Sequence, residues 1–509
     1  MNSQNKKIAK NTVFLYIRML LLIAVNFYTT RVVLEALGID DFGLYNVVAG
    51  FVALVAFINQ SLTNSIQRFI NFELGKNNNN GAHQFIQSSI FAQWILIIFL
   101  LVIAESIGVW FVNAYLNIPE GQKFAANIVY QTSVFTVLFG IFRSAYNAII
   151  IAKERMQFYA IVSLIEGFLQ LGIAYILLIS LSNRLIIYGF ALLGVSIIIT
   201  CVYIIYAHRL MPQIGIKAMY NAEHLKQIAS FCGWNIFGAA SGVVKSQGIN
   251  ILMNIFFGVV VNAARGIASQ VLNCVFKLAS NFQVAMYPQI IQSYASNNRS
   301  RYLSLSYSCS KISIYFMWLI TLPILITTPE VLKIWLGNNI PEYTVIFVRI
   351  ILFSGIIDGL GSAISTPIYA TGKIKKYQIS VSLIILMIIP ISYIAFKLGY
   401  PPQSSMYISL VLSIIAQAQR VRIWCQLVDE NPFNYIKQIT LPSVYIIVIS
   451  TLLSISVSQI FTPSFISIVI ISLLTLFINV ILIYLIGLNS QEKTYVMDSI
   501  KKFQYKFKS

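Results

Sequence analysis

The residues of greatest chemical interest are charged side chains inside long apolar stretches, where membrane proteins rarely place them. A charge at the centre of a bilayer costs roughly 2.5 to 3.5 kcal/mol on insertion scales, so it faces protein or a wet cavity rather than lipid. The basic residues in such stretches are Arg18, Arg31, Arg143, Lys245, Arg265, Lys277 and Arg349. The acids there are Glu35, Glu105, Glu166 and Asp358. This positive excess favours an anionic ligand group, because a cationic group would need unpaired carboxylates.

Two polar stripes accompany these charges. Gln270, Asn273, Lys277 and Asn281 recur at steps of three and four residues, so they share one face of a helix. Gln60 and Asn64 are spaced in the same way in another stretch. Amide stripes of this kind can join neighbouring helices. The lysine suggests a second function, because its ammonium group can hold a phosphate.

Two pairings compete with ligand binding at these charges. Lys277 and Asp358 are expected at similar depth, so they either form a structural ion pair or leave Lys277 for a ligand. Arg143 and Glu166 are expected on neighbouring helices near the inner face, where a structural pair is the first interpretation. Lys245 lies in a stretch rich in glycine, a composition typical of close helix packing or of a helix that bends.

The composition defines the class of protein in which these residues are found. Of the 509 residues, 58% are hydrophobic and only 10% are charged, which indicates an integral membrane protein built from helices. The net charge of +19 does not indicate a nucleic-acid partner, because most basic residues fall in short loops on one side of the predicted membrane. The five cysteines and three histidines have no metal-site spacing, and we expect neither metal nor cofactor. There is no motif for ATP hydrolysis.

The hydropathy pattern predicts an all-α, polytopic fold with about fourteen transmembrane helices, since each crossing needs about 20 apolar residues. The predicted spans are 11–36, 43–66, 85–112, 124–151, 159–181, 185–207, 227–257, 260–287, 306–327, 345–370, 378–397, 404–424, 439–460 and 465–487. An even number of spans places both termini on one side of the membrane. The basic loops make that side cytoplasmic.

We expect two lobes of six helices and two additional helices. The predicted lobes are residues 1–210 and 211–437, followed by two helices in 438–488 and an amphipathic basic cytoplasmic tail in 489–509. The hairpin turn at Gly38 recurs in character at Gly258, and Gln60 falls level with Gln283 if Gly43 is matched to Gly266. This similarity predicts an internal repeat.

Several segments resemble the polysaccharide transporter family, which includes the Wzx-type oligosaccharide flippases. This family belongs to the multidrug/oligosaccharidyl-lipid/polysaccharide exporter superfamily. The segments are KNTVFLYIRMLLLIAVNFYTTRVVLEALGIDDFGLYNVVAG, FFGVVVNAARGIASQV and EVLKIWLG. The resemblance implies two lobes around a central cavity in the bacterial inner membrane. It also implies transfer of undecaprenyl-diphosphate-linked oligosaccharide to the outer leaflet for surface polysaccharides such as O-antigen lipopolysaccharide.

The expected site residues lie inside predicted spans and have charged or amide side chains. The residues expected to bind substrate are Arg18, Gln60, Asn64, Lys245, Gln270, Asn273, Lys277 and Asn281, and Asp358 is the expected ion-coupling acid. The expected partners are the lipid-linked oligosaccharide, membrane lipids and other proteins of polysaccharide assembly. Two alternatives remain: a cation-coupled multidrug antiporter of the same superfamily, and a membrane glycan polymerase or ligase. The antiporter would need unpaired acids, and the enzyme would need a large outer loop, which we do not find.

Overall fold

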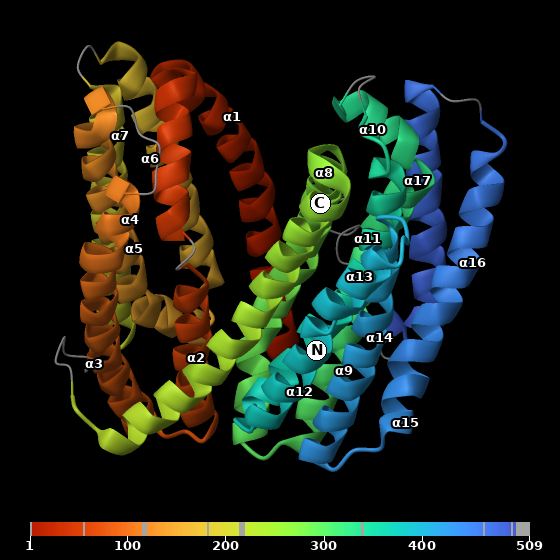
Figure 1. Ribbon diagram of the computed structural model, residues 1–509. Helices are drawn as coiled ribbons and strands as arrows, with labels where there is room; N and C mark the ends of the chain where they lie inside the picture. Colours follow the sequence, from red (N-terminus) through yellow and green to blue (C-terminus); the bar gives the residue numbers. More distant parts are fainter. Residues whose placement is uncertain are drawn as a thin grey trace, which may run out of the picture. The chain divides into compact units, whose positions relative to one another are not determined.

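The computed structural model describes residues 3–53, 56–114, 120–180, 183–212, 219–336, 340–461, 464–489 and 492–494 (Figure 1). All regular secondary structure in these residues is helical. Eleven helices in the described chain are long and apolar enough to cross a membrane. The predicted all-α, polytopic membrane fold is therefore confirmed. Most of the predicted basic tail, 495–509, lies outside the described residues.

The helices vary widely in length. The longer ones are α1 (Ser3–Ala53), α2 (Ala56–Gly75), α3 (Asn79–Ile103), α5 (Lys123–Ala152), α6 (Met156–Ile179), α7 (Arg184–Leu210), α8 (Ala222–Ala295), α9 (Arg299–Ile326), α11 (Thr344–Thr371), α14 (Ser404–Val428), α16 (Leu441–Ser458) and α17 (Phe465–Leu482). The shorter ones are α4 (Val109–Ala114), α10 (Thr328–Leu336), α12 (Lys375–Leu386), α13 (Ile388–Lys397) and α15 (Pro432–Tyr435). Three π-helical turns, η1 (Ala104–Gly108), η3 (Ile436–Thr440) and η4 (Ile483–Gly487), and the 3-10 turn η2 (Glu120–Gln122) complete the set.

The chain forms two compact units. Unit 1 contains Met1–Ala240 and Val284–Arg299, and unit 2 contains Ser241–Gln283 and Ser300–Ser509. In unit 1, α1 packs along α6 and α5 packs along α7. In unit 2, α11 packs along α14, and α16 packs along α17. The long helix α8 contributes to both units (Figure 1).

Eleven of the fourteen predicted spans coincide with the eleven helices that are long and apolar enough to cross a membrane. The other three, 43–66, 227–257 and 260–287, fall on α1 with α2 and on the two parts of α8. They contain the polar stripes and Lys245.

Helices α1 and α8 each contain one sharp break. Gly38 has φ 79° and ψ 171°, and Gly258 has φ 80° and ψ −171°. Only glycine adopts this backbone region readily, because any other side chain would collide with its own backbone. The labels α1 and α8 therefore each cover two helices that meet at a glycine, and the hairpin turn expected at Gly38 lies at such a junction.

The breaks belong to a repeat with a fixed register. Position 258 lies 220 residues after position 38, and the same interval separates Asn77 from Asn297, whose φ angles are 58° and 57°. Helices α3 and α9 begin at Asn79 and Arg299, again 220 residues apart. The internal repeat is present, but matching Gly43 with Gly266 was wrong by three residues. In the observed register Gln60 corresponds to Ser280 and not to Gln283.

The C-terminal end of α8 is held in unit 1 by hydrogen bonds. The Tyr287 hydroxyl donates to the Asn64 carbonyl oxygen at 3.2 Å, and Gln292 Nε2 donates to Asn71 Oδ1 at 3.1 Å. Gln289 Nε2 donates to the carboxylate of Glu154, in the turn between α5 and α6. These bonds join α8 to α2 and to that turn.

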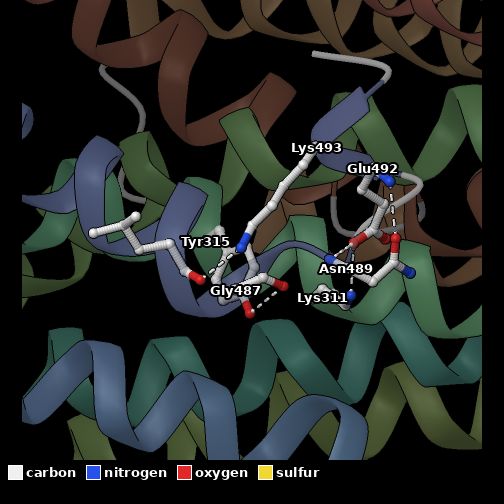
Figure 2. Close-up of polar contacts among 7 residues, drawn as sticks. Lys311, Tyr315, Gly487, Asn489, Glu492 and Lys493 are labelled. Carbon is white, nitrogen blue, oxygen red and sulfur yellow. Dashed lines mark hydrogen bonds and ion pairs between the residues drawn. The ribbon is translucent and has the colours of Figure 1, made fainter. Parts of the chain in front are cut away.

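The segment after η4 contains a capping box and is joined to α9 by an ion pair (Figure 2). The Glu492 backbone amide donates to Asn489 Oδ1 at 2.8 Å, and the Asn489 amide donates to Glu492 Oε2 at 2.8 Å. This reciprocal pair is the signature of a helix start. The same Glu492 oxygen lies 2.9 Å from Lys311 Nζ on α9, and the Lys311 side chain is only 9% exposed. The Glu492 carboxylate therefore both caps the segment and holds it against α9.

Candidate functional site

A polar pocket lies inside unit 1 between α1, α5, α6 and α7. Its volume is about 300 Å³. It is lined by Arg18, Leu22 and Asn26 of α1, Arg143 and Asn147 of α5, Tyr159, Ser163, Glu166, Gly167 and Gln170 of α6, and Tyr203 of α7. Helices α1 and α6 approach closely because α6 has no side chain at Gly167, where a Cβ atom would lie 2.8 Å from Leu22 Cδ2.

Arg18 provides a positive charge in this pocket without a carboxylate partner among the described residues. Its Cζ lies 4.4 Å from the centre of the Tyr159 ring, a distance at which a cation is attracted to the ring face. Its Nε is buried and donates no hydrogen bond to any group that the structure describes. Since a buried donor without an acceptor is costly, Arg18 can accept an additional anionic partner.

Arg143 and Glu166 form the structural pair that the sequence predicts. Arg143 Nη1 lies 3.2 Å from Glu166 Oε1, and the Arg143 Cζ lies 5.4 Å from the centre of the Tyr203 ring. The carboxylate neutralises one guanidinium group of the pocket. The pocket therefore has a net charge of one positive unit, which Arg18 carries.

Unit 2 holds a second pair of opposite charges. Lys245 Nζ of α8 lies 3.5 Å from Asp358 Oδ2 of α11, with side chains that are 21% and 30% exposed. Of the two alternatives for Lys277, the ion pair with Asp358 is not found, because Lys245 occupies that place. Lys277 is exposed and makes no ion pair with any described residue.

The two amide stripes differ in their contacts. Gln60 Nε2 donates to Asn64 Oδ1 at 2.9 Å, so the α2 stripe satisfies part of its hydrogen bonding within the helix. Gln270 and Asn273 are exposed on α8 together with Lys277, and Asn281 is partly buried. Arg18, Gln60 and Asn64 belong to unit 1, whereas the other expected site residues belong to unit 2.

Several pocket residues were missed from the sequence although the pattern was present. On α6 the polar residues Tyr159, Ser163, Glu166 and Gln170 recur at steps of four, three and four. This is the same spacing that identified the stripe around Lys277, and it predicts one polar helix face. The signal of this α6 stripe is weak in the sequence, because Tyr159 is aromatic and Glu166 already has an expected partner in Arg143. Among the described residues no three His, Cys, Asp or Glu side chains are grouped as metal ligands.

Comparison with known proteins identifies the fold. No protein-family model matches the chain, and a search of curated proteins gave no match. The chain is similar to an outward-facing multidrug resistance MATE family transporter of the MOP superfamily, with a TM-score of 0.72 and 13% identity over 84% of this chain and 96% of the other. It is also similar to a MOP superfamily transporter from Pyrococcus furiosus, described as having a binding pocket of reverse polarity, with a TM-score of 0.70 and 12% identity. That match covers 83% of this chain and 96% of the other.

A MATE protein in complex with MaD3S gives a TM-score of 0.70 and 14% identity, over 83% of this chain and 97% of the other. The chain therefore has the fold of MATE transporters of the MOP superfamily. The expected superfamily fold is confirmed. The expected flippase family within it remains a prediction.

Proposed function

We propose that the chain is a transporter that moves a lipid-linked oligosaccharide with a diphosphate head from the inner to the outer leaflet. The observation that carries this proposal is Arg18, an arginine without a carboxylate partner among the described residues, in the polar pocket of unit 1. An anionic head group supplies what Arg18 lacks. A guanidinium group binds phosphate oxygens through two parallel N–H donors, a geometry that also fixes orientation.

The physical task explains why the charge lies inside the fold. A diphosphate with attached sugars does not cross hydrocarbon unaided, because each desolvated charge costs many kcal/mol. A cationic, hydrated path lowers this cost while the lipid tail stays in the bilayer. Lys277 supports the proposal, since it is a second cation without an ion-pair partner among the described residues.

Asp358 is our proposed coupling acid. Its carboxylate is partly exposed and pairs with Lys245, so protonation of Asp358 would remove the attraction between the two side chains. Such a change could alternate with substrate binding as the transporter changes the side to which it opens. The coupling ion would then be a proton.

A multidrug antiporter is the second candidate, because two of the similar structures are MATE proteins, one of them described as a multidrug resistance transporter. A cationic drug would need an unpaired carboxylate. The acid in the pocket of unit 1 is Glu166, which Arg143 neutralises. This charge balance favours the anionic substrate. The similar transporter from Pyrococcus furiosus, described as having a binding pocket of reverse polarity, is consistent with a fold that accommodates more than one polarity.

The test is transfer of fluorescent undecaprenyl-diphosphate-linked oligosaccharide in proteoliposomes. Transfer is followed by the loss of protection from an external quencher. We expect Arg18→Gln to slow transfer at least about tenfold, since roughly 1.4 kcal/mol of lost interaction gives that factor. Arg31→Gln is the matched control, because Arg31 is an exposed arginine on the same helix that does not line the pocket.

Either of two outcomes would contradict the proposal. If the wild-type protein moves only cationic dyes, the substrate is wrong. If Arg18→Gln and Arg31→Gln transfer the oligosaccharide equally well, then the pocket of unit 1 is not the binding site.

A further inference from the structure

Unit 2 contains a buried arginine that takes no part in the proposed transport site. Arg420 of α14 is only 7% exposed, although it lies within a helix long and apolar enough to span the membrane. Its guanidinium group lies against α11 at Gly361, where a Cβ atom would be 2.3 Å from Arg420 Nη1 and 2.6 Å from Cζ. Gly361 therefore makes the space that the guanidinium group occupies.

Part of the hydrogen-bonding capacity of Arg420 is unused. Its Nε and Nη1 atoms are inaccessible and have no acceptor within the described part of the chain. No ion pair of Arg420 with a described residue is found either. A guanidinium group has two edges that each present a pair of N–H groups, and here each edge has at least one unused donor.

This arrangement conflicts with the usual rule for buried charges. Arginine stays protonated in proteins, so Arg420 cannot avoid the cost of burial by losing its proton. Buried charges are normally paired, because an uncompensated charge is strongly destabilising. In unit 1, Arg143 on α5 obeys the rule, since it is paired with Glu166. In unit 2 the described residues provide no equivalent acid for Arg420.

We propose that Arg420, where it lies against α11 at Gly361, binds a small monovalent inorganic anion of the chloride class. One negative charge balances the one positive charge. A small ion suits a site in which the guanidinium group itself fills the space that Gly361 leaves. This site is independent of the substrate, and it stands whether or not the proposed function does.

The experiment measures thermal unfolding of the purified full-length protein in sodium gluconate, with chloride replacing gluconate at constant ionic strength. Chloride is expected to raise the melting temperature of the wild-type protein in a saturable manner, because a ligand that binds only the folded state stabilises it. Arg420→Gln should abolish this rise. Gly361→Ala should abolish it too, because the added methyl group displaces the guanidinium group while the arginine remains.

The matched control is Arg422→Gln. Arg422 is exposed two residues further along the same helix, and its substitution removes the same charge without touching the site. It should respond to chloride like the wild-type protein. Bromide in place of chloride should also give an anomalous diffraction peak beside Arg420 in crystals.

The proposal is overturned if chloride gives no saturable rise in the wild-type protein. It is also overturned if Arg420→Gln responds to chloride as strongly as Arg422→Gln does. Should Arg420→Gln fail to fold, Gly361→Ala carries the comparison, because it preserves the net charge of the chain.

Discussion

The ion pair between Lys311 and Glu492 gives the most quantitative prediction. Breaking a fully buried pair by removing one partner costs about 3–5 kcal/mol. The Glu492 side chain is 24% exposed and that of Lys311 is 9% exposed, so water reaches the pair from the glutamate side. We therefore expect Glu492→Gln to cost about 2–3 kcal/mol, because the Lys311 ammonium group stays buried without a counter-charge.

The complementary variant should be much milder. Lys311→Met removes the buried charge itself and leaves Glu492 partly hydrated, with its hydrogen bond from the Asn489 amide intact. We expect it to cost less than about 1 kcal/mol. The double variant should resemble Lys311→Met, since no buried charge then remains. This asymmetry follows from which partner is buried, and not from the length of the ion pair.

The assay is hydrogen exchange of the Glu492 backbone amide, which donates to Asn489 Oδ1 and reports local opening of the capping box (Figure 2). A loss of 2–3 kcal/mol corresponds to roughly 30- to 150-fold faster exchange, at 1.36 kcal/mol for each factor of ten. Glu342→Gln, at an exposed carboxylate, is the control. The reasoning is refuted if Glu492→Gln leaves the exchange rate unchanged, or if Lys311→Met accelerates it more.

Two further predictions concern the backbone break in α8 and a buried hydroxyl group. Gly258→Ala should lower stability by about 1–3 kcal/mol, because the φ of 80° at position 258 strains any side chain. Gly233→Ala should raise stability slightly, because position 233 lies in a regular helix with open space around an added methyl group. Thermal unfolding of both variants checks this, and equal effects would contradict it. Tyr302→Phe should cost about 1–3 kcal/mol, because the Tyr302 hydroxyl accepts from Trp424 Nε1 and donates to the Pro367 carbonyl, both at 3.0 Å. A melting temperature equal to that of the exposed control Tyr400→Phe would disprove it.

The membrane fold could be predicted because its signal is local. A run of apolar residues long enough to cross a bilayer identifies a span without knowledge of its neighbours, and all eleven candidate spans of the described chain coincide with predicted ones. The pair of Arg143 and Glu166 was also predictable, because the two residues lie at similar depth on adjacent spans. Local patterns thus identified the spans and one of the contacts between them.

The partner of Asp358 could not be predicted, because an error of one helical turn moves a side chain by about 5.4 Å along the axis. Only the packing of α8 against α11 shows that Lys245, and not Lys277, lies opposite Asp358. The burial of Arg420 was still harder to predict from the sequence. Its sequence position near the end of a span indicated a charge at the cytoplasmic face, whereas its burial depends on a glycine in another helix, Gly361.

The repeat of 220 residues also bears on how the two halves of the chain have diverged. The interval is constant from the glycine breaks to the starts of α3 and α9, and it shifts by one residue later, as the starts of α6 and α12 show. The side chains along the same stretch differ, with Gln60 in one half and Ser280 in the other. The two halves therefore share the lengths and bends of their helices, while the chemistry of their side chains differs. Insertions should therefore be tolerated poorly between the break and the following helix, in either half, and single polar substitutions there should be tolerated well.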